Sequence, residues 1–275
     1  MQVQIAQSGN MRFYRSSGCS RAEPPLCCVR GDNAEHSKVA SECAELLVSG
    51  AGRLLDFSSA QPGEAEDSAL GRLLRARLFA AFGDNAVSIV CYCTCGQVES
   101  GGFGGAWHHD AASVLAHPDG TACDWLALYY LSPICEPADI GHPWLEVALT
   151  DDASDAAALR ATFCTLALER RELLLLRNDD ILHRTPRLTA VTAAPSLRRF
   201  LYAPFAVFDA EGTPLRHLHA AGLAWTASEL HADFSAHIAC ELKTSALSFE
   251  QYIDETFEQP DDAMLDGDSL AMFQT

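Results

Sequence analysis

Residues 107–110 read Trp-His-His-Asp, and residues 172–186 read Glu-Leu-Leu-Leu-Leu-Arg-Asn-Asp-Asp-Ile-Leu-His-Arg-Thr-Pro. In an extended segment, side chains two positions apart lie on one side, so His108 and Asp110 would face a common point while His109 faces away. His183 ends the apolar run of the second block, 73 residues after Asp110. Two imidazoles and one carboxylate on one face can hold a metal ion and leave coordination positions open. The two blocks therefore predict strands that meet at a metal centre.

A His-x-Asp motif is common by chance, so a second interpretation has to be weighed. In that interpretation, His108 and His109 are loop residues and His183 caps a strand. The ordered set of residues favours metal ligation, because Arg199 follows His183 after 16 residues and leads into a further apolar segment. We therefore expect His108, Asp110 and His183 to be the metal ligands.

The surrounding sequence has the pattern of a sheet. Short apolar runs are separated by clusters of Gly, Pro, Asn and Asp, which favour turns. We expect strands at residues 87–93, 125–131, 144–149, 172–176 and 200–208. Residues 96–105 contain five glycines and are expected to form a loop at the mouth of the site.

Helices are expected before and after this β-rich region. Apolar residues recur at helical spacing within residues 34–55 and 69–82, and again within residues 215–224 and 229–242. Helices that precede a β-rich core suggest a helical layer on the outside of the larger sheet.

The chain is expected to divide into three regions. Residues 1–33 show no sustained hydrophobic period and are expected to form a disordered or loosely ordered leader. Residues 34–209 would form the main domain, with helices at 34–82 and the β-rich core at 87–209. Residues 210–275 would form a helical C-terminal segment with an acidic tail.

Several motifs within residues 87–209 are similar to those of one enzyme family. They are Val-Cys-Tyr at 90–92 followed by a Gly-rich loop and His-x-Asp, Tyr-Tyr-Leu-Ser-Pro at 129–133, the distal-histidine run at 174–186, and Arg-Phe-Leu-Tyr-Ala-Pro-Phe at 199–205. With them the chain resembles the prolyl 4-hydroxylase-like branch of the iron(II)- and 2-oxoglutarate-dependent oxygenases, which includes the oxygen-sensing prolyl hydroxylases. The resemblance covers somewhat under half of the chain. It implies a double-stranded β-helix (jelly-roll) core.

The resemblance also assigns roles to individual residues. The three metal ligands would hold Fe(II), and Arg199 would form a bidentate salt bridge to the distal carboxylate of 2-oxoglutarate, a task that suits a planar guanidinium. Tyr130 would donate a hydrogen bond to the same carboxylate, which leaves Tyr129 facing the core. Tyr92 would lie near the iron and the substrate entrance. Arg198 is the rival of Arg199, because adjacent strand residues face opposite sides and only one can point inward; we favour Arg199.

The sequence departs from the family pattern at three places. Residues 141–145 read Gly-His-Pro-Trp-Leu where the family usually has Gly-Gly-Glu-Leu, and His142 is expected to be a loop residue. Thr121, after Asp-Gly at 119–120, stands where the family often has arginine. The interval from His183 to Arg199 is also longer than expected. None of these departures alters a metal ligand.

The function that the resemblance implies is a dioxygenase. It would couple the decarboxylation of 2-oxoglutarate to succinate with the hydroxylation of a C–H bond, using dioxygen, and ascorbate is a further candidate cofactor. The expected substrate is a prolyl residue of a protein or peptide; the alternative is a small molecule or a free amino acid. Two other classes stay open: a non-catalytic binding or sensing module that kept the fold, and a cupin-like metal hydrolase or isomerase, which would not need Arg199.

Charge and cysteine content narrow the partners and the compartment. The formal net charge is −18, and residues 209–275 alone carry 13 acidic residues against two basic ones. A chain this acidic binds polyphosphates poorly, and we therefore expect no nucleic-acid binding. No apolar run reaches the roughly 18 residues of a membrane span, so no membrane partner is expected.

Eleven cysteines without a secretory signal favour a reducing, cytoplasmic or other intracellular compartment. The start of the chain has several arginines and serines and no acidic residue before Glu23, which is also compatible with import into an organelle. Cys91, Cys93 and Cys95 resemble a metal-binding tract, but their alternation equally fits one face of a strand.

Overall fold

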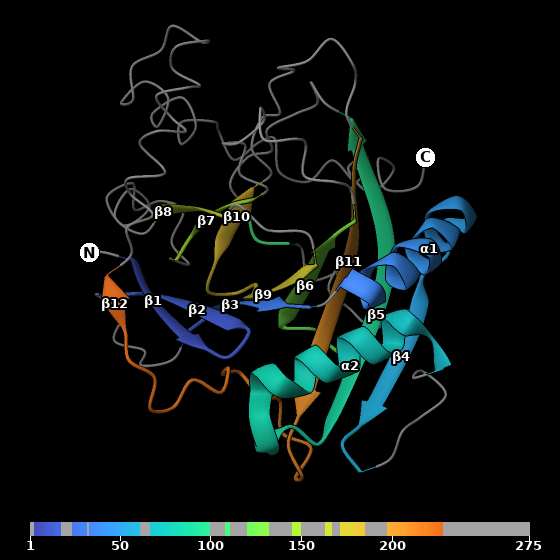
Figure 1. Cartoon of the computed structure of the whole chain (residues 1–275). Coiled ribbons are helices and arrows are strands. Elements are labelled where there is room, and N and C mark those ends of the chain that lie inside the picture. The colour runs from blue at the N-terminus through green and yellow to red at the C-terminus, as the bar shows by residue number, and fades with distance from the viewer. Residues whose placement is uncertain are drawn as a thin grey trace, which may run out of the picture.

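A computed structural model of the protein describes residues 3–17, 24–31, 33–60, 67–99, 108–110, 120–131, 145–149, 163–166, 171–184 and 197–227. Over these residues the chain forms three layers: two α-helices, a large sheet of nine strands and a small sheet of three strands (Figure 1). The fold class is therefore mainly β with flanking helices, as expected. The two sheets correspond to the two walls of a double-stranded β-helix.

The large sheet has the strand order β12-β1-β2-β3-β9-β6-β11-β5-β4, and neighbouring strands are antiparallel. Its strands are β1 (Val3–Ser8), β2 (Met11–Ser16), β3 (Leu26–Arg30), β4 (Arg53–Ser58), β5 (Ser88–Glu99), β6 (Trp125–Tyr130), β9 (Glu172–Arg177), β11 (Leu197–Phe208) and β12 (Thr226–Ala227). The small sheet has the order β10-β7-β8, formed by β7 (Leu145–Ala148), β8 (Phe163–Leu166) and β10 (Leu182–Arg184).

Two hydrophobic cores lie on opposite faces of the large sheet. Along β6, Trp125 and Tyr129 belong to the core that the helices cover, whereas Leu126 and Leu128 pack with Val147 of β7 in the core against the small sheet. A strand buried on both faces needs apolar side chains at successive positions. This explains why the central strands β6 and β9 read as continuous apolar runs.

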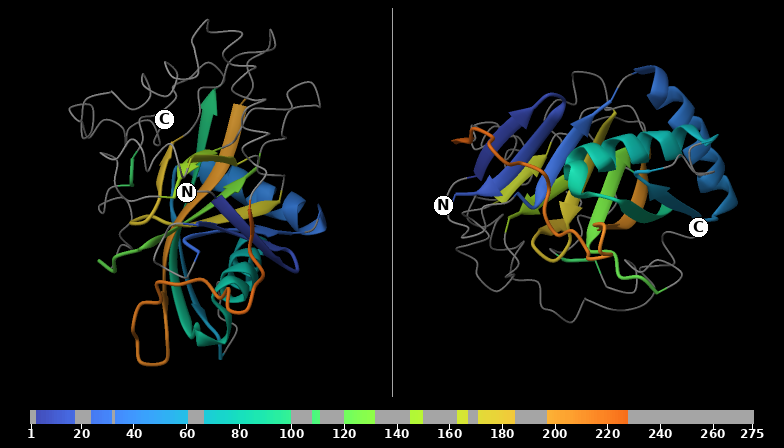
Figure 2. Two further views of the ribbon diagram at one scale, coloured as in Figure 1. Left: turned by 90° about the vertical axis from the view of Figure 1, so that its left-hand side faces the viewer. Right: turned by 90° about the horizontal axis from the view of Figure 1, so that it is seen from below.

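The helices α1 (Asn33–Ser49) and α2 (Ala69–Phe82) lie together over one face of the large sheet (Figure 2). The α2 helix begins after Ser68, whose hydroxyl accepts a hydrogen bond from Gly71 N at 2.8 Å, and ends at Gly83, where φ is 69°. A short 3-10 turn, η2 (Gly83–Asn85), then leads toward β5. Both helices occupy the outer layer expected from the sequence. Neither of them, nor any other helix in the described ranges, is long and apolar enough to span a bilayer.

The expectation of a loose leader at residues 1–33 was wrong. Strands β1, β2 and β3 lie within this region, and β3 pairs with β9 in the interior of the large sheet. Four of the five residues of β3 are buried. The residues of β9 that pair with β3 lie more than 140 positions away, so no local hydrophobic period predicted β3.

The helix expected to run to residue 55 ends at Ser49, because Gly50 takes a positive φ of 62° and the chain turns into the edge strand β4. The helix expected at residues 215–224 is absent. In that segment Leu215 O accepts a hydrogen bond from the indole of Trp125, and His219 N donates to Ala81 O, so tertiary bonds replace helical ones. Residues 228–275, including the expected helix at 229–242 and the acidic tail, lie outside the described residues.

Candidate metal centre

The structure brings His108, Asp110 and His183 together. Their potential ligand atoms all lie within 4.8 Å of one another. Asp110 Oδ1 is 3.8 Å from His108 Nε2, and Asp110 Oδ2 is 3.3 Å from His183 Nε2. The two imidazole rings are tilted by 49° to each other, with centroids 4.7 Å apart. Within the described residues, no other group of three or more such ligands converges in this way.

Backbone pairing holds the two histidines in register. His108 N donates to His183 O and His183 N donates to His108 O, both at 3.1 Å. Residue 108 therefore continues the small sheet beyond β10, whose other neighbour is β7. This pairing joins two segments 75 positions apart, and it places two imidazoles side by side at a sheet edge.

The side chains fit a divalent metal ion better than they fit one another. Contacts of 3.3 and 3.8 Å are long for direct hydrogen bonds between imidazole and carboxylate. Ligand atoms about 2.1 Å from a common ion, at right angles, are separated by roughly 3 Å. His183 is buried, and its Nδ1 has no hydrogen-bond partner within the described part of the chain. Two imidazoles and a carboxylate are also the donor set of non-haem iron sites with open positions.

Tyr202 of β11 is a residue of this site that the sequence did not single out. Its side chain packs in the core against the small sheet, and it interacts with the Asp110 carboxylate. Burial and the neighbouring carboxylate raise the pKa of the Tyr202 hydroxyl well above its usual value. Burial alone would raise the pKa of Asp110, but the neighbouring imidazoles of His183 and His108, together with Tyr202, bring it below its usual value. The carboxylate is thus held in its anionic, metal-binding form.

Tyr130 and Tyr129 face opposite sides of the large sheet, as expected. Tyr130 is buried in the core against the small sheet, with its ring centroid 6.2 Å from that of Phe200. Tyr129 points to the helices, where its hydroxyl lies 2.8 Å from His36 Nδ1. Tyr130 is therefore on the same face of the sheet as Tyr202, which interacts with the Asp110 carboxylate.

Arg199 does not share that face. Along β11, Leu201 and Ala203 pack toward the helices while Phe200 and Tyr202 pack toward the small sheet, so alternation assigns Arg199 to the helix side. Its side chain is exposed. Arg198 lies two positions before Phe200, on the strand positions that Phe200 and Tyr202 also occupy, and its side chain lies outside the described residues. The exposed position of Arg199 on the helix side thus argues against choosing Arg199 over Arg198.

Tyr92 of β5 lies toward the β4 edge of the large sheet. Its hydroxyl occupies the position that a side chain on Gly52 would need, 2.0 Å from an ideal Cβ built there. The structure places Tyr92 over the turn between α1 and β4, and its expected place beside the iron stays a prediction. Residues 107, 119, 132–133 and 141–144, which carry other motif positions, lie outside the described residues.

The cysteines of β5 follow the strand interpretation. Cys91 and Cys93 are fully buried in the core under the helices, and Cys95 packs against the same core. Their Sγ atoms at positions 91 and 93 are 3.6 Å apart. A hydrogen bond from Cys91, together with burial, raises the pKa of the Cys93 thiol well above its usual value. A buried thiol with a raised pKa, such as that of Cys93, is a poor metal ligand.

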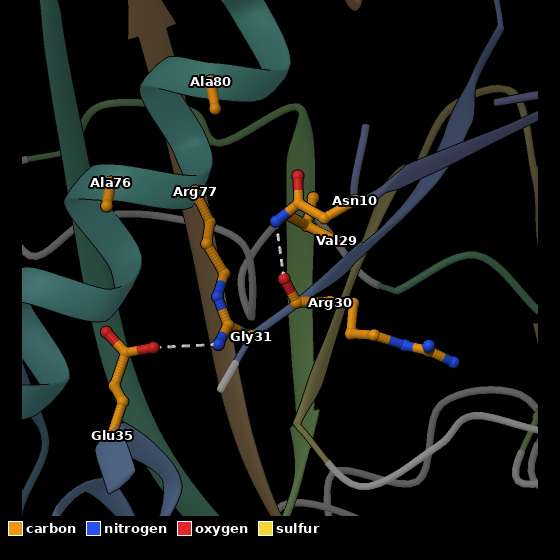
Figure 3. A pocket seen from close by; sticks show the side chains of 8 residues that line it. All are labelled: Asn10, Val29, Arg30, Gly31, Glu35, Ala76, Arg77 and Ala80. Carbon is orange, nitrogen blue, oxygen red and sulfur yellow. Dashed lines mark hydrogen bonds and ion pairs between the residues drawn. The ribbon is translucent and has the colours of Figure 1, made fainter. Parts of the chain in front are cut away.

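A separate cavity of about 390 Å³ opens on the helix side of the large sheet (Figure 3). Arg77 of α2 is one of the residues that line it, with Nη2 3.1 Å from Glu35 Oε2 and Nη1 donating to Arg171 O at 2.8 Å. Gly31 faces the Arg77 guanidinium directly. The metal ligands lie near the small sheet, on the other side.

No family model matches the chain, and no curated protein sequence is significantly similar to it. Among solved structures, a prolyl-4-hydroxylase from Pseudomonas putida is similar with a TM-score of 0.42 and 15% identity, over 67% of this chain and 88% of that one. A prolyl hydroxylase from Trichoplax adhaerens, in complex with a hypoxia-inducible factor peptide fragment, gives a TM-score of 0.38 and 16% identity, over 68% and 85%.

A third similar structure is HygX from Streptomyces hygroscopicus with nickel and 2-oxoglutarate bound, at a TM-score of 0.34 and 13% identity, over 66% of this chain and 82% of that one. The chain is thus similar to two solved prolyl hydroxylases and to a protein solved with nickel and 2-oxoglutarate bound. All three TM-scores lie below 0.5, so the fold assignment rests on the strand order, the two cores and the registers described above.

Proposed function

We propose that the protein is an iron(II)- and 2-oxoglutarate-dependent dioxygenase that hydroxylates a C–H bond. The observation that carries this proposal is the convergence of His108, Asp110 and His183 within 4.8 Å at the edge of the small sheet. Bound Fe(II) would supply dioxygen activation coupled to the decarboxylation of 2-oxoglutarate to succinate. The task of the chain itself is to hold the two histidines and the carboxylate on one face and leave the opposite positions open.

Within this proposal, the polar residues of the inner face would bind the co-substrate. Tyr130 is buried on that face, and its hydroxyl would donate a hydrogen bond to the distal carboxylate of 2-oxoglutarate. Arg198 would form the salt bridge to the same carboxylate. Its position is two residues before Phe200, so it belongs to the face of β11 that Phe200 and Tyr202 share, whereas Arg199 belongs to the helix side. A bidentate guanidinium contact supplies both affinity and orientation.

A matched pair of variants, Arg198→Met and Arg199→Met, tests this assignment. With the protein saturated in Mn(II), 2-oxoglutarate affinity is measured by calorimetry. Loss of a buried, hydrogen-bonded charge pair costs about 2–5 kcal/mol, so Arg198→Met should weaken 2-oxoglutarate binding by about 30-fold or more. Arg199→Met should stay within about three-fold of wild type. The opposite ranking would return the role to Arg199, and unchanged affinity in both variants would contradict a 2-oxoglutarate site on β11.

The substrate we propose is a prolyl residue of a protein or peptide, which rests on the resemblance of residues 87–209 to the prolyl hydroxylase branch. The test is a screen of proline-containing peptides against free amino acids and small molecules, with Fe(II), 2-oxoglutarate and ascorbate present. Succinate formation and the gain of one oxygen atom by the substrate are measured together. Oxygen transfer to a free amino acid or small molecule, without any to peptides, would replace the prolyl assignment.

A further inference from the structure

Asn178 is a buried amide in the turn after β9, and its side chain forms hydrogen bonds with the backbone of Asp110, one of the candidate metal ligands. Its Oδ1 accepts a hydrogen bond from Asp110 N at 2.8 Å, and its Nδ2 donates to Asp110 O at 3.0 Å. Only 8% of the residue is exposed. The side chain thus presents to Asp110 the same donor and acceptor pair that a neighbouring strand would present.

The two ends of the His-x-Asp segment are therefore fixed by different elements. The backbone of His108 pairs with that of His183 in β10, and the backbone of Asp110 pairs with the side chain of Asn178. Both the N–H and the C=O of Asp110 are satisfied by this one amide. Without it, the backbone of Asp110, whose carboxylate must meet the two imidazoles, would lose both of these hydrogen bonds.

The turn that carries Asn178 is itself held rigidly. Asn178 N donates to Asp124 O at 3.0 Å. The guanidinium of Arg177 is nearly buried and binds both oxygens of Asp179, at 2.7 and 2.9 Å, and Asp180 Oδ2 at 3.0 Å. Arg177 Nη1 also donates to Arg216 O at 3.0 Å, which ties the turn to the segment after β11. The amide therefore has little freedom to follow Asp110 if that residue moves.

We propose that Asn178 is a positioning residue for the metal centre: it sets the direction of the Asp110 carboxylate toward the ion. The inference rests on the metal centre of the proposed function. Outer partners of metal ligands typically contribute 10- to 100-fold to metal affinity, because a ligand that is already in place pays less ordering entropy on binding. A residue that merely stabilised the fold would change the unfolding free energy and leave metal affinity unchanged.

The test is a Co(II) titration of Asn178→Ala, followed by the visible absorption of the bound ion. We expect a dissociation constant about 10-fold or more above that of wild type, and an altered Co(II) spectrum because the carboxylate is misaligned. Asn178→Ser, which keeps one hydroxyl able to bond Asp110 N, should fall between the two. Leu70→Ala is the control: it removes buried volume from α2 on the helix side and should lower stability without changing the Co(II) dissociation constant.

Circular dichroism and thermal melts establish which variants are folded, and if Asn178→Ala does not fold, Asn178→Ser decides. A folded variant that binds Co(II) within two-fold of wild type, with the same spectrum, overturns the inference. Wild type that binds Co(II) but neither binds 2-oxoglutarate nor forms succinate would overturn the proposed function alone, and a raised dissociation constant in the variant would still support the role of Asn178. Wild type that binds no Co(II) would overturn both.

Discussion

Gly31→Ala should destabilise the protein strongly, although the backbone at Gly31 would accept an alanine. Gly31 is not among the residues with positive φ. A Cβ atom built on it would lie 1.5 Å from Arg77 Nη2 and 2.5 Å from Arg77 Cζ, which no relaxed structure permits. The guanidinium would have to leave its place beside Gly31 (Figure 3).

The cost follows from the contacts that Arg77 would lose. Its side chain is 6% exposed, and it holds Glu35 at 3.1 Å and Arg171 O at 2.8 Å. It also lies over the ring of Tyr129 at 5.3 Å. Breaking a buried ion pair costs about 3–5 kcal/mol, and a partly exposed partner such as Glu35 lowers that figure. We expect Gly31→Ala to lower the unfolding free energy by about 3 kcal/mol.

Urea denaturation of a double-mutant cycle measures this directly. In an Arg77→Met background the longer charged group is gone, so Gly31→Ala should cost less than about 1 kcal/mol. The control is Gly50→Ala, where φ is +62° and no atom lies within 4 Å of an added Cβ, so the cost is backbone strain of about 1 kcal/mol. If Gly31→Ala costs no more than Gly50→Ala, or costs the same in both backgrounds, the described position of Arg77 is wrong.

Two further predictions concern residues away from the metal ligands. Tyr129→Phe removes the 2.8 Å contact with His36 and should cost about 1 kcal/mol at neutral pH. Burial raises the pKa of Tyr129 to about 12, whereas the usual tyrosine pKa is about 10. Between these pH values the unfolded wild type ionises first, so the wild type loses stability as the pH rises. The difference in unfolding free energy between wild type and variant, measured by urea titration, should therefore shrink over this range. Trp225→Ala removes the stacking of Arg15, 4.0 Å above its ring, and should cost about 1 kcal/mol; strict additivity with Arg15→Gln would contradict that contact.

The sequence predicted best those elements whose signals are local. The α2 helix matched residues 69–82, because Ser68 and Gly83 mark its ends and its apolar residues recur at helical spacing. Strands β6 and β9 stood out as apolar runs, since both of their faces are buried. The convergence of His108, Asp110 and His183 could be predicted because a His-x-Asp motif and a distal histidine are residue types that suit a metal site.

What the sequence did not predict depends on contacts between distant segments. Strand β3 is held by β9, and the segment from Leu215 to Trp225 is held by bonds to α2 and β6, so local pattern misled in both places. Asn178 looks like an ordinary turn residue, and only its pairing with Asp110, 68 positions earlier, reveals its place in the site. Alternation alone cannot say which of Arg198 and Arg199 faces inward until the side chains of neighbours such as Tyr202 are assigned to a face.

The measurement that tests the central claim most directly is an anaerobic titration with Fe(II) and 2-oxoglutarate, followed by visible absorption, on wild type and on His183→Ala. A chelated 2-oxoglutarate should give wild type a weak charge-transfer band in the visible range. The variant lacks one of the two imidazoles of the centre and should show no band while remaining folded. Wild type that binds iron without producing the band would contradict the 2-oxoglutarate-dependent oxygenase assignment and favour a non-catalytic metal-binding module.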